Sequence, residues 1–231
     1  MFRCVDAPGL LDRRIAAGTA DMTEGPAMTR AQAVEAIETG IALVKDCKAQ
    51  GYGLLATGEM GIGNTTTSSA IASVLLSRSP AEVTGRGAGL DDEGLTRKVT
   101  ASERAIKVNK PDPNDALDVL SKLGGFDIAG LCGVFLGGAL YGVPVLVDGF
   151  ISAVAALVAF RLCPNAANVM LPSHISAEPA GKAVLDELRL RPLVTAGMRL
   201  GEGTGAVAVM PLLDMALAVY NDLMTFADIG M

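Results

Sequence analysis

Three carboxylates come directly after apolar segments of the chain and could do acid–base chemistry. Glu59 and Glu202 each lie within a glycine-rich turn, and Asp148 follows the apolar run 143–147. In an open α/β sheet, ligands bind outside the carboxyl ends of the strands, which is where such side chains lie. A carboxylate at that place acts either as a general base or as the cap of the next helix. Both interpretations are open, and the helix that Asp148 would cap begins at Ile151.

The glycine-rich segment 58–67 has the composition of a phosphate-binding loop. Glycine lets the backbone approach a ligand closely, and the helical pattern that follows would present free N–H groups to an anion. The spacing matches neither the dinucleotide-binding motif nor the P-loop, so a tight strand-to-helix turn explains the glycines equally well. A second glycine-rich loop, residues 85–89, precedes a helical pattern with Lys98, which by itself reads as a solvated helical lysine.

The composition indicates a folded chain that acts on small molecules. The 231 residues are 50% hydrophobic and 19% charged, which excludes a disordered chain and supports one sizeable core. Lys and Arg number 19 against 25 Asp and Glu, so the net charge is −6. No run of basic residues offers the positive stripe that nucleic-acid binding requires, and no nucleic-acid partner is expected.

The cysteines form no metal-binding pattern. Cys4, Cys47, Cys132 and Cys163 contain no C-x-x-C pair, and His174 is the one histidine that could join them. A structural zinc site needs clustered ligands, so we expect no metal and interpret the cysteines as buried free thiols in a reducing cytoplasm. His174 itself reads as a loop residue whose polar atoms are satisfied by the backbone.

One apolar stretch is long enough to raise the question of a membrane. Residues 128–147 are twenty positions without a charge, but they contain five glycines and Pro144. A helix that ends near Gly142, followed by a buried strand over residues 143–147, explains the stretch better. The N-terminus shows no signal-peptide pattern, so the sequence predicts a cytoplasmic protein without a membrane span.

Short apolar strands alternate with helical patterns, which predicts an α/β fold with a Rossmann-like parallel sheet flanked by helices. The chain divides into an irregular segment of about residues 1–28 and a core of about residues 29–231, taken together as one domain. A capping box of Thr29 and Gln32 begins the first helix. The expected strands are residues 52–57, 143–147 and 169–171; the later expected helices begin at Asp112–Pro113, Asp127, Ile151 and Pro179, and a last apolar helix follows residue 205.

Five blocks in this sequence resemble the signature of the nicotinate-nucleotide–dimethylbenzimidazole phosphoribosyltransferases. They occur in the family's order and with similar spacing, and the match runs from about Leu11 to the C-terminus. The blocks are GEMGIGNTT at 58–66, GGFDI at 124–128, VLVDGF at 145–150, SHISAE at 173–178 and RLGEGTG at 199–205.

The resemblance implies a role in assembling the lower ligand of cobalamin. Enzymes of this family transfer the 5-phosphoribosyl group of nicotinate mononucleotide to 5,6-dimethylbenzimidazole, giving α-ribazole 5′-phosphate and nicotinate. It also implies a Rossmann-like α/β domain with a smaller helical part, usually in a homodimer. No metal or other cofactor is implied, because the leaving pyridinium carries its own positive charge.

On the side of the accepting base, the resemblance assigns Glu202 as the general base and Leu200 to the base pocket. Gly201 joins them as a substrate-binding residue, and Asp148 matches a supporting carboxylate of the active site. We expect Glu202 to be partly desolvated among apolar neighbours, which would raise the pKa of its carboxyl toward that of an effective base.

On the side of the nucleotide, the resemblance assigns five further positions. Glu59 and Gly61 match residues near the bound nucleotide. Lys98, Gly87 and Ser176 match its phosphate contacts, with Lys98 supplying charge and Gly87 a backbone N–H group.

The sequence departs from the family at its N-terminal end, where relatives carry additional chain that contributes helices and some contacts to the benzimidazole ring. Two interpretations follow. In one, the chain is an active phosphoribosyltransferase or its main catalytic portion. In the other, it is a truncated, non-catalytic nucleotide-binding protein or a subunit that needs a partner chain.

Overall fold

A small parallel sheet lies at the centre of the fold in the computed structural model, which describes residues 9–87, 89–226, 228 and 230. Over these residues the sheet has the strands β1 (Leu55–Ala56), β2 (Val145–Val147) and β3 (Met170–Pro172), in the order β1-β2-β3. All neighbours are parallel, with Leu55 paired with Val145 and Val145 with Met170. The three predicted strands are therefore present, although β1 and β2 are shorter than predicted and β3 lies one residue later.

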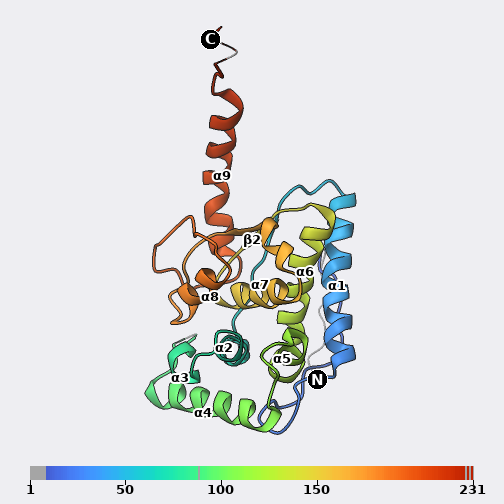
Figure 1. The fold of residues 1–231 in the computed structure, drawn as a ribbon, viewed down its shortest axis with the longest axis vertical. Coiled ribbons are helices and arrows are strands. Elements are labelled where there is room, and N and C mark those ends of the chain that lie inside the picture. The colour runs from blue at the N-terminus through green and yellow to red at the C-terminus, as the bar shows by residue number, and fades with distance from the viewer. Residues whose placement is uncertain (1–8, 88, 227, 229, 231) are drawn as a thin grey trace.

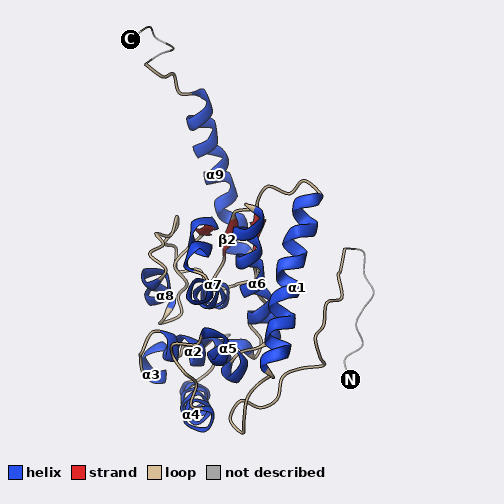
Figure 2. Ribbon diagram, turned by 45° about the vertical axis from the view of Figure 1, so that its right-hand side comes forward, coloured by secondary structure: helices blue, strands red, loops and turns tan. Residues whose placement is uncertain are grey.

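Helices surround this sheet, which confirms the predicted α/β class (Figure 1, Figure 2). Helices α6 and α7 pack against each other and against β2, and α1 lies along α6. Helices α2, α4 and α5 form a second group at the opposite end of the molecule from α9 (Figure 1). The helices are α1 (Arg30–Ala49), α2 (Asn64–Leu75), α3 (Pro80–Val83), α4 (Asp92–Asn109), α5 (Ala116–Leu123), α6 (Phe126–Tyr141), α7 (Phe150–Leu162), α8 (Gly181–Glu187) and α9 (Thr204–Asp222), with a 3-10 helix η1 (Pro164–Val169).

Local sequence determines several helix ends as predicted. The backbone N–H of Gln32 donates to the Thr29 hydroxyl, and the Gln32 side chain accepts from the Thr29 N–H, which completes the predicted capping box of α1. Helix α6 ends where expected, because Gly142 takes a left-handed conformation with φ +64° and β2 begins three residues later. The uncharged stretch is therefore a helix and a strand, each too short to span a bilayer.

Two predicted helix starts are wrong. The helix expected at Asp112–Pro113 begins at Ala116, because Asp115 is the residue whose carboxylate accepts the N–H groups of Leu117 and Asp118. Asp112 instead accepts the N–H of Asn114 in the preceding turn. The helix expected to begin at Pro179 begins at Gly181, because a turn in which the Gly181 N–H donates to the Glu178 carbonyl precedes it.

Helices α1 and α6 approach closely because glycines face each other between them. A Cβ atom on Gly40 would overlap the carbonyl oxygen of Gly130, and one on Gly133 would overlap the carbonyl oxygen of Ile37. The helix backbones are thus in contact, and the interior side chains of α6 pack around this contact, with Phe135 fully buried.

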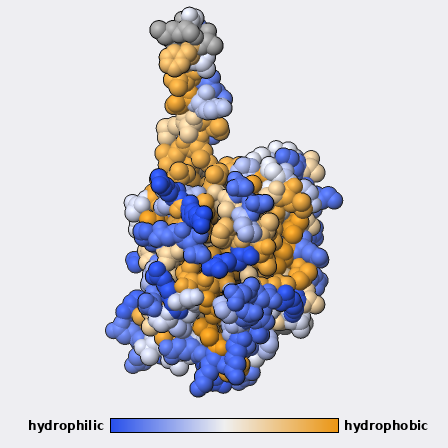
Figure 3. Space-filling model, viewed as in Figure 1, coloured by the Kyte–Doolittle hydropathy of each residue, from blue (hydrophilic) through white to orange (hydrophobic). Residues whose placement is uncertain are grey.

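Helix α9 extends away from the rest of the molecule, and apolar side chains cover much of its surface (Figure 1, Figure 3). Its first turns are buried at Ala206 and Val209, which pack on Leu146 of β2, whereas Leu217 and Tyr220 are 57% and 83% exposed. By length and composition α9 could cross a membrane. A single helix of this kind is weak evidence for a membrane protein.

The expectation of buried thiols holds for one cysteine. Cys132 is fully buried in α6, and desolvation raises the pKa of its thiol. Cys47 is half-buried and Cys163 is exposed, so the expectation is wrong for these two. Cys4 lies outside the described residues.

We expect Gly133→Ala to lower the free energy of unfolding by about 1–3 kcal/mol, because its methyl group must push α1 away from α6. Gly130→Ala is the matched control. Its Cβ would lie 4.0 Å from the nearest neighbouring atom, the Ala36 carbonyl oxygen, so higher helix propensity should stabilise it by up to about 1 kcal/mol. Urea denaturation of both variants measures the difference, and equal stabilities would contradict this packing.

Candidate functional site

A cavity of about 90 Å³ lies beside the carboxyl ends of all three strands. Residues 59–61 follow β1, residues 148–152 follow β2, and His174, Ser176 and Glu178 follow β3. The segment 199–201, ahead of α9, completes this part of the wall. The location is the one that parallel-sheet topology favours for a ligand site, and the carboxylates singled out in the sequence lie in or next to it.

Two loops far apart in the sequence are joined at this cavity. The N–H of Glu202 donates to the carbonyl oxygen of Glu59 at 2.8 Å. A Cβ atom on Gly58 would overlap the backbone nitrogen of Gly203, and one on Gly201 would lie 2.8 Å from the Glu59 carbonyl oxygen. Glycine is therefore needed at both positions for the backbones to meet.

Asp148 connects the end of β2 to the start of α9. The residue is 3% exposed. Its Oδ1 accepts the N–H groups of Gly205 at 2.9 Å and Ala206 at 3.1 Å, and Oδ2 accepts that of Gly203 at 3.1 Å. The interpretation of Asp148 as the cap of the helix near Ile151 is wrong, because that carboxylate satisfies the N-terminal N–H groups of α9 instead.

Glu202 lies in a run of three left-handed residues. Its φ is +58°, between Gly201 and Gly203 at +78° each. For a residue with a Cβ atom this conformation costs about 1–2 kcal/mol, which the hydrogen bonds to Asp148 and Glu59 offset. The side chain is exposed, so the expectation that it is partly desolvated is wrong for this structure.

Glu59 is half-buried in the loop after β1. Its Oε2 accepts the N–H of Gly61 at 2.6 Å, which stabilises the turn that Gly61 makes with φ +84°. The residue that precedes α2 is Gly63, which provides no side-chain cap. Within the described part of the chain no side chain caps the start of α2, and neither Glu59 nor Glu202 caps the helix that follows it.

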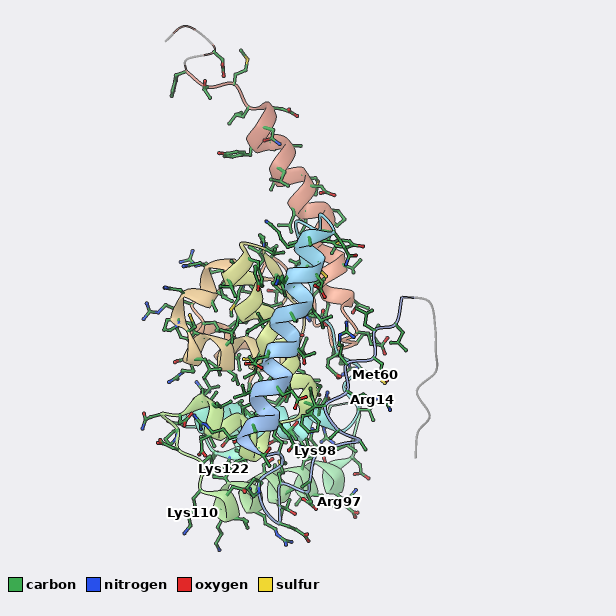
Figure 4. The ribbon with its side chains drawn as sticks, turned by 90° about the vertical axis from the view of Figure 1, so that its right-hand side faces the viewer. Arg14, Met60, Arg97, Lys98, Lys110 and Lys122 are labelled. Atoms are coloured by element: carbon green, nitrogen blue, oxygen red, sulfur yellow. The ribbon has the colours of Figure 1, made fainter. Side chains whose placement is uncertain are left out.

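Lys98 is buried, which excludes a solvated helical lysine. Its side chain points into the protein from α4, while Arg97 lies at the outer edge (Figure 4). The ammonium group donates to the Gly85 carbonyl oxygen at 2.8 Å and to Oγ1 of Thr65 at 3.0 Å. Burial lowers the pKa of Lys98, and the nearby carboxylate of Glu178 acts in the opposite direction.

His174 is a buried residue of the cavity wall that sequence reasoning did not identify as functional. Its Nδ1 lies 2.9 Å from Oγ of Ser173, and that hydroxyl also lies 2.7 Å from the Val147 carbonyl oxygen. A hydroxyl has one proton. When Ser173 donates it to the Val147 carbonyl oxygen, its Oγ accepts from Nδ1 of His174, and in a neutral imidazole Nε2 then presents a lone pair.

The structure brings most of the sequence-predicted site residues together. Lys98 lies behind the wall, in contact with Thr65, and Glu202 lies next to the wall without lining it. Thr65, His174 and Glu178 were not predicted; all three stand inside family-like blocks, which are the one feature that could have indicated them. The predicted residues that line the cavity are Glu59, Gly61, Gly87, Asp148, Ser176, Leu200 and Gly201.

The model of the phosphoribosyltransferase family matches residues 2–231. The chain belongs to this family. It is 52% identical to the nicotinate-nucleotide–dimethylbenzimidazole phosphoribosyltransferase of Ruminiclostridium cellulolyticum and 50% identical to that of Acetivibrio thermocellus, over 97% of this chain in both cases. The chain spans 64% of the length of either relative. The crystal structure of CobT from Thermus thermophilus is similar with a TM-score of 0.93 and 39% identity, covering 100% of this chain and 68% of that one.

Within this family member, Asp148→Asn should lower the free energy of unfolding by about 1–3 kcal/mol, because an amide nitrogen cannot accept a backbone N–H. Amide hydrogen exchange at Gly203 and Gly205 should speed up. Asp214→Asn makes the same charge change on an exposed position of α9 and should have no effect. Unchanged exchange in Asp148→Asn would contradict the capping role.

His174 should be neutral at pH 7 with its proton on Nδ1, because burial lowers the pKa of its imidazole despite the opposite effect of Asp148. In the unfolded chain the imidazole takes up a proton near pH 6.5, and in the folded chain only at lower pH. The unfolding free energy should therefore fall as the pH decreases below about 6.5, and His174→Asn should remove that slope. Nitrogen-15 NMR measures the tautomer directly, since the chain has one histidine, and a charged imidazole at pH 7 would contradict it.

Proposed function

We propose that this chain transfers the 5-phosphoribosyl group of nicotinate mononucleotide to 5,6-dimethylbenzimidazole, releasing α-ribazole 5′-phosphate and nicotinate for cobalamin assembly. The observation that carries the proposal is the combination of groups at one cavity. A buried cation, Lys98, lies behind one part of the wall, and a carboxylate on an ordered loop, Glu202, lies next to another. The names of the similar proteins support the same reaction.

Lys98 and the start of α2 form an anion-binding region for the nucleotide's phosphate. The ammonium group has three donors, of which Thr65 and Gly85 take two within the described structure. The first turn of α2 contains no acidic residue and lacks a side-chain cap, so its N–H groups and dipole favour an anion. Ser176 and Gly87 also line the cavity.

Glu202 acts as the general base in the proposed reaction. It takes the N–H proton of the benzimidazole while the other ring nitrogen attacks C1′ of the ribose. The bond between C1′ and the pyridinium nitrogen breaks, and its electron pair neutralises the leaving ring, so nicotinate departs without protonation. Asp148 acts as a positioning residue, since its bond to the Gly203 N–H holds the loop that carries Glu202.

A second candidate is a nucleotide-binding subunit that needs a partner chain. The cavity of about 90 Å³ is smaller than the roughly 300–1,000 Å³ of pockets that enclose small molecules. Glu202 is also exposed, and apolar side chains of α9 such as Leu217 are uncovered.

We further propose that the chain is cytoplasmic and that it forms a homodimer. The exposed apolar surface of α9 supports the homodimer, because such surfaces favour association.

The experiment incubates the purified chain with both substrates and detects α-ribazole 5′-phosphate by chromatography and mass spectrometry. We expect product, and we expect Glu202→Gln to lower kcat by roughly 10²–10⁴ while leaving the Kd for nicotinate mononucleotide unchanged. Glu103→Gln, which makes the same charge change on the exposed side of α4, should be fully active.

Binding of the nucleotide without product would favour the subunit interpretation over the enzyme. Product formation that Glu202→Gln leaves unchanged would remove Glu202 from the base role.

A further inference from the structure

The carboxylate of Glu178 lies in the cavity wall against the loop that contains Gly85 and Gly87. Its Oε1 accepts the Gly87 N–H at 3.0 Å, and its Oε2 is buried without a hydrogen-bond partner among the described residues. A Cβ atom on Gly85 would overlap Oε2, so the carboxylate touches the loop backbone itself. A buried, unpaired carboxylate oxygen costs free energy, and this arrangement is therefore stable only with compensation from nearby positive groups.

The groups that compensate the charge of the Glu178 carboxylate are a buried cation and a helix N-terminus, which stabilise any anion. The Lys98 ammonium group holds the same loop through the Gly85 carbonyl oxygen and interacts electrostatically with Glu178. Thr65, in the first turn of α2, lies next to Gly87 in the same wall and contacts the ammonium group. The carboxylate of Glu178 is thus an anion held by a backbone N–H beside a buried cation and a helix N-terminus.

While the Glu178 carboxylate accepts the Gly87 N–H, a phosphate cannot accept the same N–H group. A backbone N–H has one proton, and that of Gly87 is already donated to Glu178. We propose that the Glu178 carboxylate occupies the phosphate subsite of the ligand-free protein and that the phosphate of the nucleotide displaces it. This inference rests on the proposed function, because that function places a phosphate beside Lys98.

Displacement needs a side-chain rotation rather than a loop movement. The backbone of Glu178 is held on both sides: its N–H lies 3.3 Å from Oγ of Ser176, and its carbonyl oxygen accepts the Gly181 N–H. Rotation of the side chain frees the Gly87 N–H and enlarges a cavity that is small at about 90 Å³. An entering ligand must interact with these groups more strongly than the Glu178 carboxylate does. The subsite therefore selects doubly charged phosphomonoesters over singly charged anions.

The test compares the wild type with Glu178→Gln by titration calorimetry, using nicotinate mononucleotide, nicotinate riboside without the phosphate, and inorganic phosphate. Removing the competing charge should tighten binding of the nucleotide and of inorganic phosphate roughly tenfold, which corresponds to about 1.4 kcal/mol. Nicotinate riboside should bind equally to both proteins, and Glu103→Gln should match the wild type. In turnover, KM for the nucleotide should fall while KM for the base stays constant.

Equal or weaker phosphate binding by Glu178→Gln would overturn the inference, because the carboxylate would then merely hold the loop. Failure of both proteins to bind inorganic phosphate would overturn it as well. Tighter phosphate binding by the variant without product from the wild type would sustain the inference and refute the proposed activity.

A second measurement does not depend on a variant. In the wild type, the nitrogen-15 signal of the Gly87 amide should shift when phosphate is added, because its acceptor changes from a carboxylate to a phosphate. An unchanged signal at saturating phosphate would overturn the proposal.

Discussion

The carboxylate of Asp148 links the central strand of the sheet to the helix that follows the glycine-rich loop. It receives N–H groups from Gly203, Gly205 and Ala206, and in this way satisfies donors that the start of α9 would otherwise leave unpaired in a buried place. Because β2 is fully buried, the backbone that precedes Asp148 is held in place, and the position of the carboxylate is held with it. The left-handed conformation of Glu202 depends on it, since a strained backbone persists only where its surroundings hold it.

Glycine makes the same junction possible from the other side. A Cβ atom on Gly205 would overlap the imidazole of His174 and lie 2.9 Å from Oδ1 of Asp148. The first turn of α9 therefore packs against the imidazole ring of His174, and the hydroxyl of Ser173 forms a hydrogen bond with Nδ1 of that ring. The side chains of Asp148, Ser173 and His174, from two strand ends, thus meet the backbone of Gly205 in a space in which no further methyl group fits.

The sequence predicted most of the helices and strands but not which of them meet in space. Alternating apolar strands and helical patterns predicted the parallel sheet, and a local capping box predicted the start of α1, because these signals lie within a few residues. The cap interpretation of Asp148 referred to the adjacent helix, because a local pattern cannot show that α9, 55 or more residues later, begins at the same sheet edge. The resemblance to a known family indicated the site residues; it gave no role to Glu178 or His174.

Burial was the property predicted least well. Lys98 follows Arg97 on α4 and has the same charge, yet Lys98 is buried and Arg97 exposed. Helical spacing shows that neighbouring residues face different directions, but which face is covered depends on α2 packing against α4. Glu202 shows the reverse case, since apolar residues close in sequence do not cover it in space.

Pro211 divides α9 into an N-terminal part that is packed on the protein and a C-terminal part that is exposed. It has no N–H group, so the carbonyl of Val207 lacks its partner within the helix at the point where the helix leaves the core. Up to this point Ala206 and Val209 are anchored in the protein, and beyond it every described residue of the helix except Leu213 is exposed. A helix can bend at such a position. The segment after Pro211 can therefore change its direction when it contacts another surface. The first turn of α9, and with it the loop that contains Glu202, keeps its geometry during such a change.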